Sequence, residues 1–139
     1  RESAQAALSW VRSHTGELGL PPEWFSDHDV HIHVPAGAVP KDGPSAGVTM
    51  ATAIASLARG KAVADDIGMT GEITLTGQVL AIGGLKDKVI AAHRAGIKTV
   101  LYPDANKRDL DEIPDVIKKD LSLVGLTKAS EAIEKTLVS

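Results

Sequence analysis

The sequence contains no cysteine, which excludes disulfide bonds, a cysteine nucleophile and thiolate metal sites. Aromatic residues make up only 3% of the chain, so its core must be built mainly from Ala, Val, Ile and Leu. No apolar run approaches the roughly 20 residues that span a bilayer, and we therefore expect no membrane partner.

The chain also lacks a large excess of positive or negative charge. The formal net charge is -3, and acidic and basic residues are interspersed along the chain. A protein that binds nucleic acid through phosphate contacts needs a broad basic surface, so we expect no direct nucleic-acid role. At 139 residues the chain fits one domain, large enough to bury about two-thirds of the surface of its unfolded form.

Hydrophobic patterning predicts strands and helices that alternate in one α+β unit, with helices packed on a mixed sheet. Within the second predicted helix, Met50, Ile54 and Leu57 follow the spacing of a core-facing stripe. The predicted helices span residues 3–14, 44–59, 85–95, 107–112 and 128–137, and the predicted strands span residues 30–34, 67–75, 79–82, 98–102 and 121–124, with a hairpin turn at 76–78.

The strongest chemical signal is the glycine- and proline-rich loop at residues 40–47, which contains Ser45. A serine in the first turn of a helix lies close to free backbone N–H groups and to the positive end of the helix dipole. The N–H groups of Ser45 and Ala46 could therefore hold an oxyanion. A serine that only caps the helix is the plain alternative.

The segment Gly43–Gly47 satisfies the G-x-S-x-G pattern of α/β-hydrolases, and this makes a serious rival interpretation. That fold needs a strand running straight into the serine, which Pro40 and Pro44 interrupt. His93 is the only histidine after Ser45 and would have to be the base. The third member of such a triad would be Asp65, Asp66 or Asp87.

A lysine could replace histidine as the general base if apolar surroundings favour its neutral amine. In the helix predicted at residues 85–95, Leu85, Val89 and Ala92 form the inward stripe. Lys88 and Lys86 flank opposite edges of this stripe. Helical geometry alone does not choose between them, and for either lysine a solvated side chain is the default.

Three motifs that occur in order along the chain closely resemble those of the Lon protease family, and the similarity extends over essentially the whole sequence. They are Pro-Lys-Asp-Gly-Pro-Ser-Ala-Gly at residues 40–47, Met-Thr-Gly-Glu-Ile-Thr-Leu at residues 69–75, and Gly-Gly-Leu-Lys-Asp-Lys at residues 83–88 followed by Ala-Ala-His-Arg-Ala-Gly at residues 91–96.

The resemblance implies a Lon-type proteolytic domain with a Ser/Lys dyad. By position, the family's serine nucleophile falls on Ser45 and its catalytic lysine on Lys88, which resolves the ambiguity with Lys86. The threonine of the second motif falls on Thr70, whose hydroxyl is expected to form a hydrogen bond with the lysine amine. An ordinary strand threonine is the alternative.

Three further residues are expected to support this site. Asp42, which precedes the nucleophile, could tune or block Lys88, or could simply bond its own backbone in a turn. His31 and His33 share one face of their predicted strand, and the resemblance places that strand near the active site. Two histidines without a third ligand are a weak metal signal, so we expect no metal.

The resemblance also implies the wider function of the protein. The intact enzymes are serine endopeptidases of ATP-dependent protein degradation that act on unfolded or damaged proteins in homo-oligomeric rings, commonly hexamers. ATP and Mg are expected for an ATPase module that is absent here, with no cofactor in this chain. We expect a cytoplasmic, bacterial location, or alternatively the mitochondrial matrix.

Residues 1–139 are expected to form the proteolytic domain without its β-rich opening part, so the dyad could be weakly active or inactive in isolation. The glycine-rich helix start could instead bind an anion or phosphate, making the fragment a binding or ring-assembly module.

Overall fold

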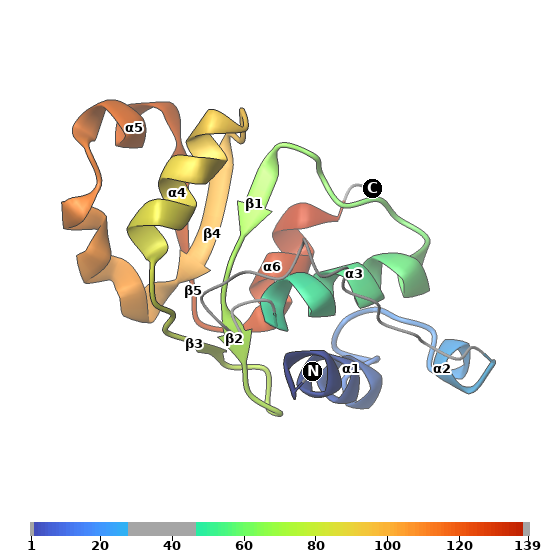
Figure 1. Ribbon diagram of the computed structural model, residues 1–139. Helices are drawn as coiled ribbons and strands as arrows, with labels where there is room; N and C mark the ends of the chain where they lie inside the picture. Colours follow the sequence, from blue (N-terminus) through green and yellow to red (C-terminus); the bar gives the residue numbers. More distant parts are fainter. Residues whose placement is uncertain (1, 28–46, 138–139) are drawn as a thin grey trace.

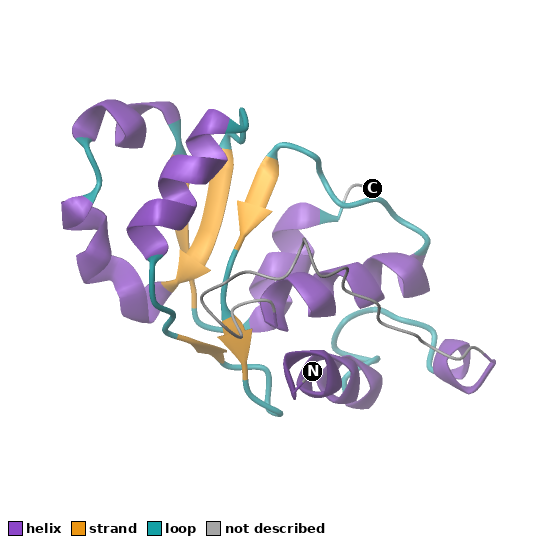
Figure 2. Ribbon diagram, viewed as in Figure 1, coloured by secondary structure: helices purple, strands orange, loops and turns teal. Residues whose placement is uncertain are grey.

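The computed structural model describes residues 2–27 and 47–137, and its centre is a parallel sheet between two helical layers (Figures 1 and 2). The sheet has the order β1-β4-β5, formed by β1 (Ile67–Met69), β4 (Thr99–Pro103) and β5 (Ser122–Leu126). One layer contains α1 (Glu2–Ser13), α3 (Gly47–Arg59) and α6 (Ala129–Thr136), and the other contains α4 (Leu85–Arg94), the 3-10 helix η2 (Asp104–Glu112) and α5 (Asp115–Asp120).

Strand β4 forms the boundary between two hydrophobic clusters, because alternate residues of a strand point to opposite faces of the sheet. Val100 and Tyr102 pack with the buried residues of α4, whereas Leu101 packs with those of α3 and α6. Leu101 is fully buried. The helices α3 and α4 therefore cover opposite faces of the same sheet.

The two parts of the expected hairpin lie beside this sheet as β2 (Glu72–Ile73) and β3 (Val79–Leu80), which pair antiparallel. The prediction of one continuous strand over residues 67–75 is wrong. Residues 67–69 pair in parallel with β4, and the chain leaves that sheet at Gly71. Gly71 has φ +147°, and an added Cβ would lie 2.9 Å from Val79 Cγ1, so only glycine fits this crossing between sheets.

The α+β class is confirmed, and the remaining differences from the predictions are local. Leu57 was expected in the core but is 65% exposed, because the buried face of α3 is formed mainly by alanines together with Val48 and Ile54. The helices α2 (Glu23–Asp27) and α5 were not predicted. The strand expected at residues 30–34 lies outside the described residues. No helix in the described ranges has both the length and the apolar character needed to cross a bilayer.

Helix α6 begins with a carboxylate cap that also supports the hairpin. The Oε1 atom of Glu131 accepts three hydrogen bonds. They come from the N–H groups of Lys128 at 2.8 Å and Thr127 at 2.9 Å, and from the Thr127 hydroxyl at 3.0 Å. The Thr127 carbonyl in turn accepts from Val79 N at 2.9 Å. The donors, with the Lys128 N–H first, lower the pKa of Glu131 from its ordinary 4.5 despite partial burial.

Replacing Glu131 by glutamine is expected to lower the free energy of unfolding at neutral pH by about 0.5–2 kcal/mol, the usual effect of losing a helix cap. Because the folded state lowers the pKa of this carboxyl, its contribution is fully present above 4.5 and is lost as the pH falls through the folded value. Urea unfolding at neutral and acidic pH measures this. A difference between wild type and Glu131→Gln that stays constant into acid would contradict the assignment.

Candidate active site

The carboxyl edge of the parallel sheet brings together two of the three motifs and the helix that continues the third. Thr70 follows the last residue of β1, and its N–H donates to Leu101 O at 3.0 Å, one step beyond the β1–β4 register. Lys88 lies in the first turn of α4, and α3 begins at Gly47, two residues after Ser45 in the sequence. Helix α4 runs back along the sheet from the edge where β1 and β4 end, whereas α3 begins near that edge and runs crosswise to the strands (Figure 1).

The start of α3 is fixed directly on the second motif. Val48 N donates to Gly71 O at 3.0 Å. A Cβ at Gly47 would lie 2.5 Å from Glu72 Oε1 and 2.9 Å from Ile73 N, which is closer than real Cβ contacts. The absence of a side chain at Gly47 is therefore what lets the helix after the serine loop lie against the segment after Thr70.

The start of α4 separates the two candidate lysines. Gly84 adopts a left-handed conformation with φ 71° and accepts a hydrogen bond from Lys88 N at 3.1 Å, closing the first helical turn. Leu85 and Val89 are buried against the sheet, as the inward stripe predicts. On this first turn Lys88 is partly buried, whereas Lys86 is exposed. The surroundings of Lys88 suit a general base better than those of Lys86.

The hydroxyl of Thr70 is a buried polar group that needs an explanation. Thr70 is 6% exposed, and its Oγ1 has no hydrogen-bond partner among the described residues. A buried hydroxyl without a partner costs about 1–3 kcal/mol, so such groups are uncommon away from functional sites. The expected hydrogen bond between this hydroxyl and the Lys88 amine is not formed in the structure, and the role of Thr70 stays a prediction.

His93 pairs with a residue away from the start of α4, which argues against the hydrolase triad. It lies in the last turn of α4, at the opposite end from Lys88. Its Nε2 is 2.8 Å from Asp120 Oδ2 at the end of α5, and both side chains are partly solvent-exposed. The acid beside His93 is therefore none of the predicted Asp65, Asp66 or Asp87, and the pair forms a surface contact between two helices.

The other predicted site residues lie outside the described residues, and their roles stay predictions. They are the expected nucleophile with its oxyanion donors and the three supporting residues, namely Ser45, Ala46, Asp42, His31 and His33. Within residues 2–27 and 47–137 there is no cluster of three His, Asp or Glu side chains that could hold a metal ion.

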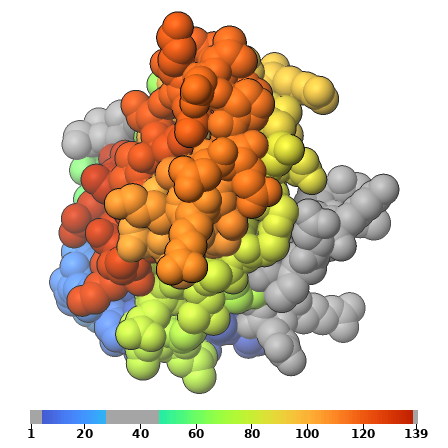
Figure 3. Space-filling model, turned by 90° about the vertical axis from the view of Figure 1, so that its left-hand side faces the viewer, coloured from blue at the N-terminus to red at the C-terminus, as the bar shows by residue number. Residues whose placement is uncertain are grey.

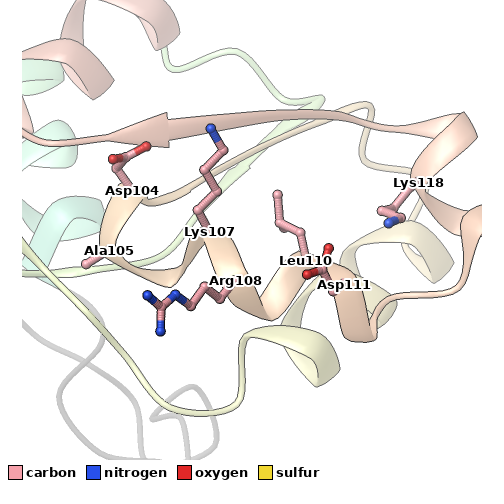
Figure 4. Close-up of a pocket in the computed structure, with 7 residues that line it drawn as sticks. All are labelled: Asp104, Ala105, Lys107, Arg108, Leu110, Asp111 and Lys118. Carbon is pink, nitrogen blue, oxygen red and sulfur yellow. The ribbon is translucent and has the colours of Figure 1, made fainter.

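A separate cavity of about 600 Å³ lies on the outer side of η2 and α5, and none of the predicted site residues lines it. In Figure 3 the η2–α5 segment, in orange, covers the upper part of this face. In Figure 4 Lys107 and Leu110 extend to one side of η2 while Arg108 extends away from it. The cavity wall is charged with both signs, by Asp104, Lys107, Arg108, Asp111 and Lys118.

Two features that hold the site together were not predicted from the sequence. Gly47 and Gly71 were treated as parts of motifs, yet their role is to allow close packing between the two motifs. Asn106 was not singled out, although it is 6% exposed and bonds the segment that leads into α4. A glycine marks a possible close approach, but a single asparagine after a strand carries no comparable signal.

Comparison with known proteins finds relatives along nearly the whole chain. The Lon protease from Escherichia coli (strain K12) is 54% identical over 137 residues, which are 99% of this chain and 18% of the relative. Lon protease 1 from Bacillus subtilis (strain 168) is 54% identical over 138 residues, also 99% of this chain and 18% of the relative. The Lon protease from Desulforamulus reducens is 60% identical over 121 residues, 87% of this chain and 15% of the relative.

The chain thus spans less than a fifth of the length of these relatives. The family description "Lon protease (S16) C-terminal proteolytic domain" matches residues 1–139, from the first residue to the last. The chain belongs to this family of proteolytic domains.

Proposed function

We propose that the chain is the peptide-cleaving unit of a Lon-type serine endopeptidase, with Ser45 as nucleophile and Lys88 as general base. The observation that carries the proposal is that α3 begins bonded to the segment just after the buried Thr70, while α4, with Lys88 in its first turn, begins at the same edge of the sheet. We expect a serine just before α3 and a lysine in the first turn of α4 to approach each other at that edge.

The proposed reaction proceeds through an acyl-enzyme. The Lys88 amine accepts the proton of the Ser45 hydroxyl as Oγ attacks the scissile carbonyl, and the N–H groups of Ser45 and Ala46 donate to the oxyanion. The resulting ammonium then gives the proton to the leaving amine. Water hydrolyses the ester in a second step, with the lysine again accepting a proton.

Thr70 fits this mechanism as an orienting group. Its buried hydroxyl has no partner among the described residues, so it has a donor and an acceptor available at the same sheet edge. A hydrogen bond between this hydroxyl and the Lys88 amine, formed when the site is assembled, would satisfy Thr70 and direct the amine lone pair. Asp42, His31 and His33 are proposed as supporting residues of the same site.

The wider function is proposed from the relatives, which are Lon proteases. The substrates are unfolded or damaged proteins, and the working form is a homo-oligomeric ring, with ATP and Mg used by a separate module. Binding of an anion at the helix start stays an untested alternative, because the glycine-rich loop lies outside the described residues.

The direct test is intact-mass detection of a covalent adduct after exposure to a serine-reactive fluorophosphonate. Wild type and His93→Ala are expected to be labelled, and Ser45→Ala is not, because only the attacking oxygen forms the adduct. His93→Ala is the matched control, since it removes the rival base at the opposite end of α4.

Loss of labelling in His93→Ala would restore the hydrolase triad, and labelling of Ser45→Ala would place the nucleophile elsewhere. Because the relatives are more than five times as long as this chain, the variants are made in the protein at its full natural length.

A further inference from the structure

The segment that connects β3 to α4 is held by one side chain from a distant part of the chain. Ile82 precedes the glycine pair Gly83 and Gly84, and it belongs to none of the strands. Its N–H donates to Asn106 Oδ1 at 2.9 Å, and its carbonyl accepts from Asn106 Nδ2 at 2.8 Å. The asparagine side chain thus pairs with both backbone polar groups of Ile82, as a neighbouring strand would.

The orientation of this amide is fixed by a third contact. Asn106 Nδ2 also donates to Asp109 Oδ2 at 2.8 Å, within the same 3-10 helix. A carboxylate accepts only, so the nitrogen of the amide must face Asp109, and the oxygen is left to accept from Ile82 N. Asn106 is 6% exposed, and its three hydrogen bonds are at least partly shielded from water.

The contact lies close to Lys88 along the chain. Ile82 is followed by two glycines, the second with φ 71°, and Gly84 O accepts the hydrogen bond from Lys88 N that closes the first turn of α4. Glycines allow many backbone conformations, so they do not by themselves fix the direction in which a helix begins. Ile82 is thus the last residue before α4 whose backbone is held by hydrogen bonds to Asn106, and α4 carries Lys88.

The side chain of Ile82 adds to the same constraint. It packs against the cluster that contains Leu85 and Val89, the buried residues of α4. Asn106 itself lies in the first turn of η2, three residues after the end of β4, the central strand of the sheet. The hydrogen bonds therefore tie the entry to α4 to the carboxyl edge of the sheet, where Thr70 also lies.

We propose that Asn106 is a positioning residue for catalysis, which holds the start of α4 so that the Lys88 amine stays within reach of the nucleophile. This inference rests on the proposed role of Lys88. Asn106 touches neither substrate nor reacting atoms, and its effect passes through Ile82 and the first turn of the helix.

The test compares Asn106→Ala with a control of similar structural cost, both at full natural length. Thr136→Val removes a buried hydroxyl that donates to Ala132 O at 2.7 Å in α6, on the opposite side of the sheet. Both variants are expected to lower the melting temperature. Only Asn106→Ala is expected to lower kcat for a fluorogenic peptide, by about 10²-fold with KM little changed, because a displaced catalytic group costs rate rather than binding.

A second pair of variants tests the orientation of the amide. Asp109→Asn keeps an oxygen that can accept from Asn106 Nδ2, and it is expected to retain most of the wild-type kcat. Asn106→Asp is isosteric but replaces the donor by an acceptor facing Ile82 O and Asp109, and it is expected to lose kcat as Asn106→Ala does.

Three outcomes would overturn the inference. They are a wild-type kcat in folded Asn106→Ala, an equal loss of kcat in Thr136→Val, and full activity in Asn106→Asp. Lys88→Ala is measured in the same series. If Lys88→Ala keeps its activity, the proposed function itself fails, whereas an inactive Lys88→Ala beside a fully active Asn106→Ala removes only the role of Asn106.

Discussion

Lys88→Ala is expected to lower kcat for peptide cleavage by about 10²–10⁴-fold, the range that a positioned general base contributes. Lys88 is partly buried in the first turn of α4, at the edge of the sheet where α3 also begins. Without its amine, the hydroxyl of Ser45 has no base, although backbone N–H groups could still hold the oxyanion. Steady-state kinetics with a fluorogenic peptide measures the effect.

Lys86→Ala is the matched control for this prediction. Lys86 lies two residues earlier in the same helical turn and carries the same charge, but it is exposed. Its removal changes the net charge and the helix propensity as Lys88→Ala does, and kcat is expected to stay near wild type. Equal losses in the two variants would mean that α4 needs positive charge in general, and a loss confined to Lys86→Ala would move the base to that residue.

Gly47→Ala is expected to lower the free energy of unfolding by about 1–3 kcal/mol, as overpacking of a buried contact does. In a helix alanine is usually favoured over glycine by about 1 kcal/mol, so the intrinsic preference works in the opposite direction. The destabilisation by overpacking is expected to exceed the gain in helix propensity. The new methyl group would lie 2.9 Å from the backbone nitrogen of Ile73, which cannot rotate away.

Activity is expected to fall in Gly47→Ala as well, by about 10²-fold, because relief of the clash moves the start of α3 and the chain leading to Ser45. Urea unfolding and peptide cleavage measure the two effects. Gly16→Ala is the control, since an added Cβ there meets nothing within 4 Å and the residue has no positive φ. A Gly47→Ala variant as stable and as active as Gly16→Ala would show that α3 does not need this close approach.

Most of the helices could be predicted from the sequence because their signals are local. Gly96, with φ 82°, lies just beyond α4, and alternating or β-branched residues mark β4 and β5. Helix α5 was missed because Pro114 reads as a stop, yet it stands at the N-cap of the next helix. The strand predicted at residues 67–75 failed because its two halves are equally apolar, and only the packing around Gly71 divides them.

For the site, the order and residues of the three motifs were enough to identify the family, which the family match confirms. The choice of Lys88 over Lys86 stays a prediction, and the partial burial of Lys88 is consistent with it. A buried Thr70 hydroxyl without a partner among the described residues could not be foreseen, since a strand threonine is usually hydrogen-bonded or exposed. The surface pairing of His93 with Asp120 likewise depends on where α5 lies.

The sequence by itself determined the family and the α+β class, because motifs and hydrophobic patterns are local, and through the family resemblance it predicted Ser45 and Lys88 as the candidate dyad. The tertiary structure alone decided which segments meet at the carboxyl edge of the sheet and which side chain holds the start of α4. Contacts such as Gly47 with Ile73 and Asn106 with Ile82 join residues more than twenty positions apart. Their formation depends on how whole helices pack on the sheet, and no local pattern of residues records that packing.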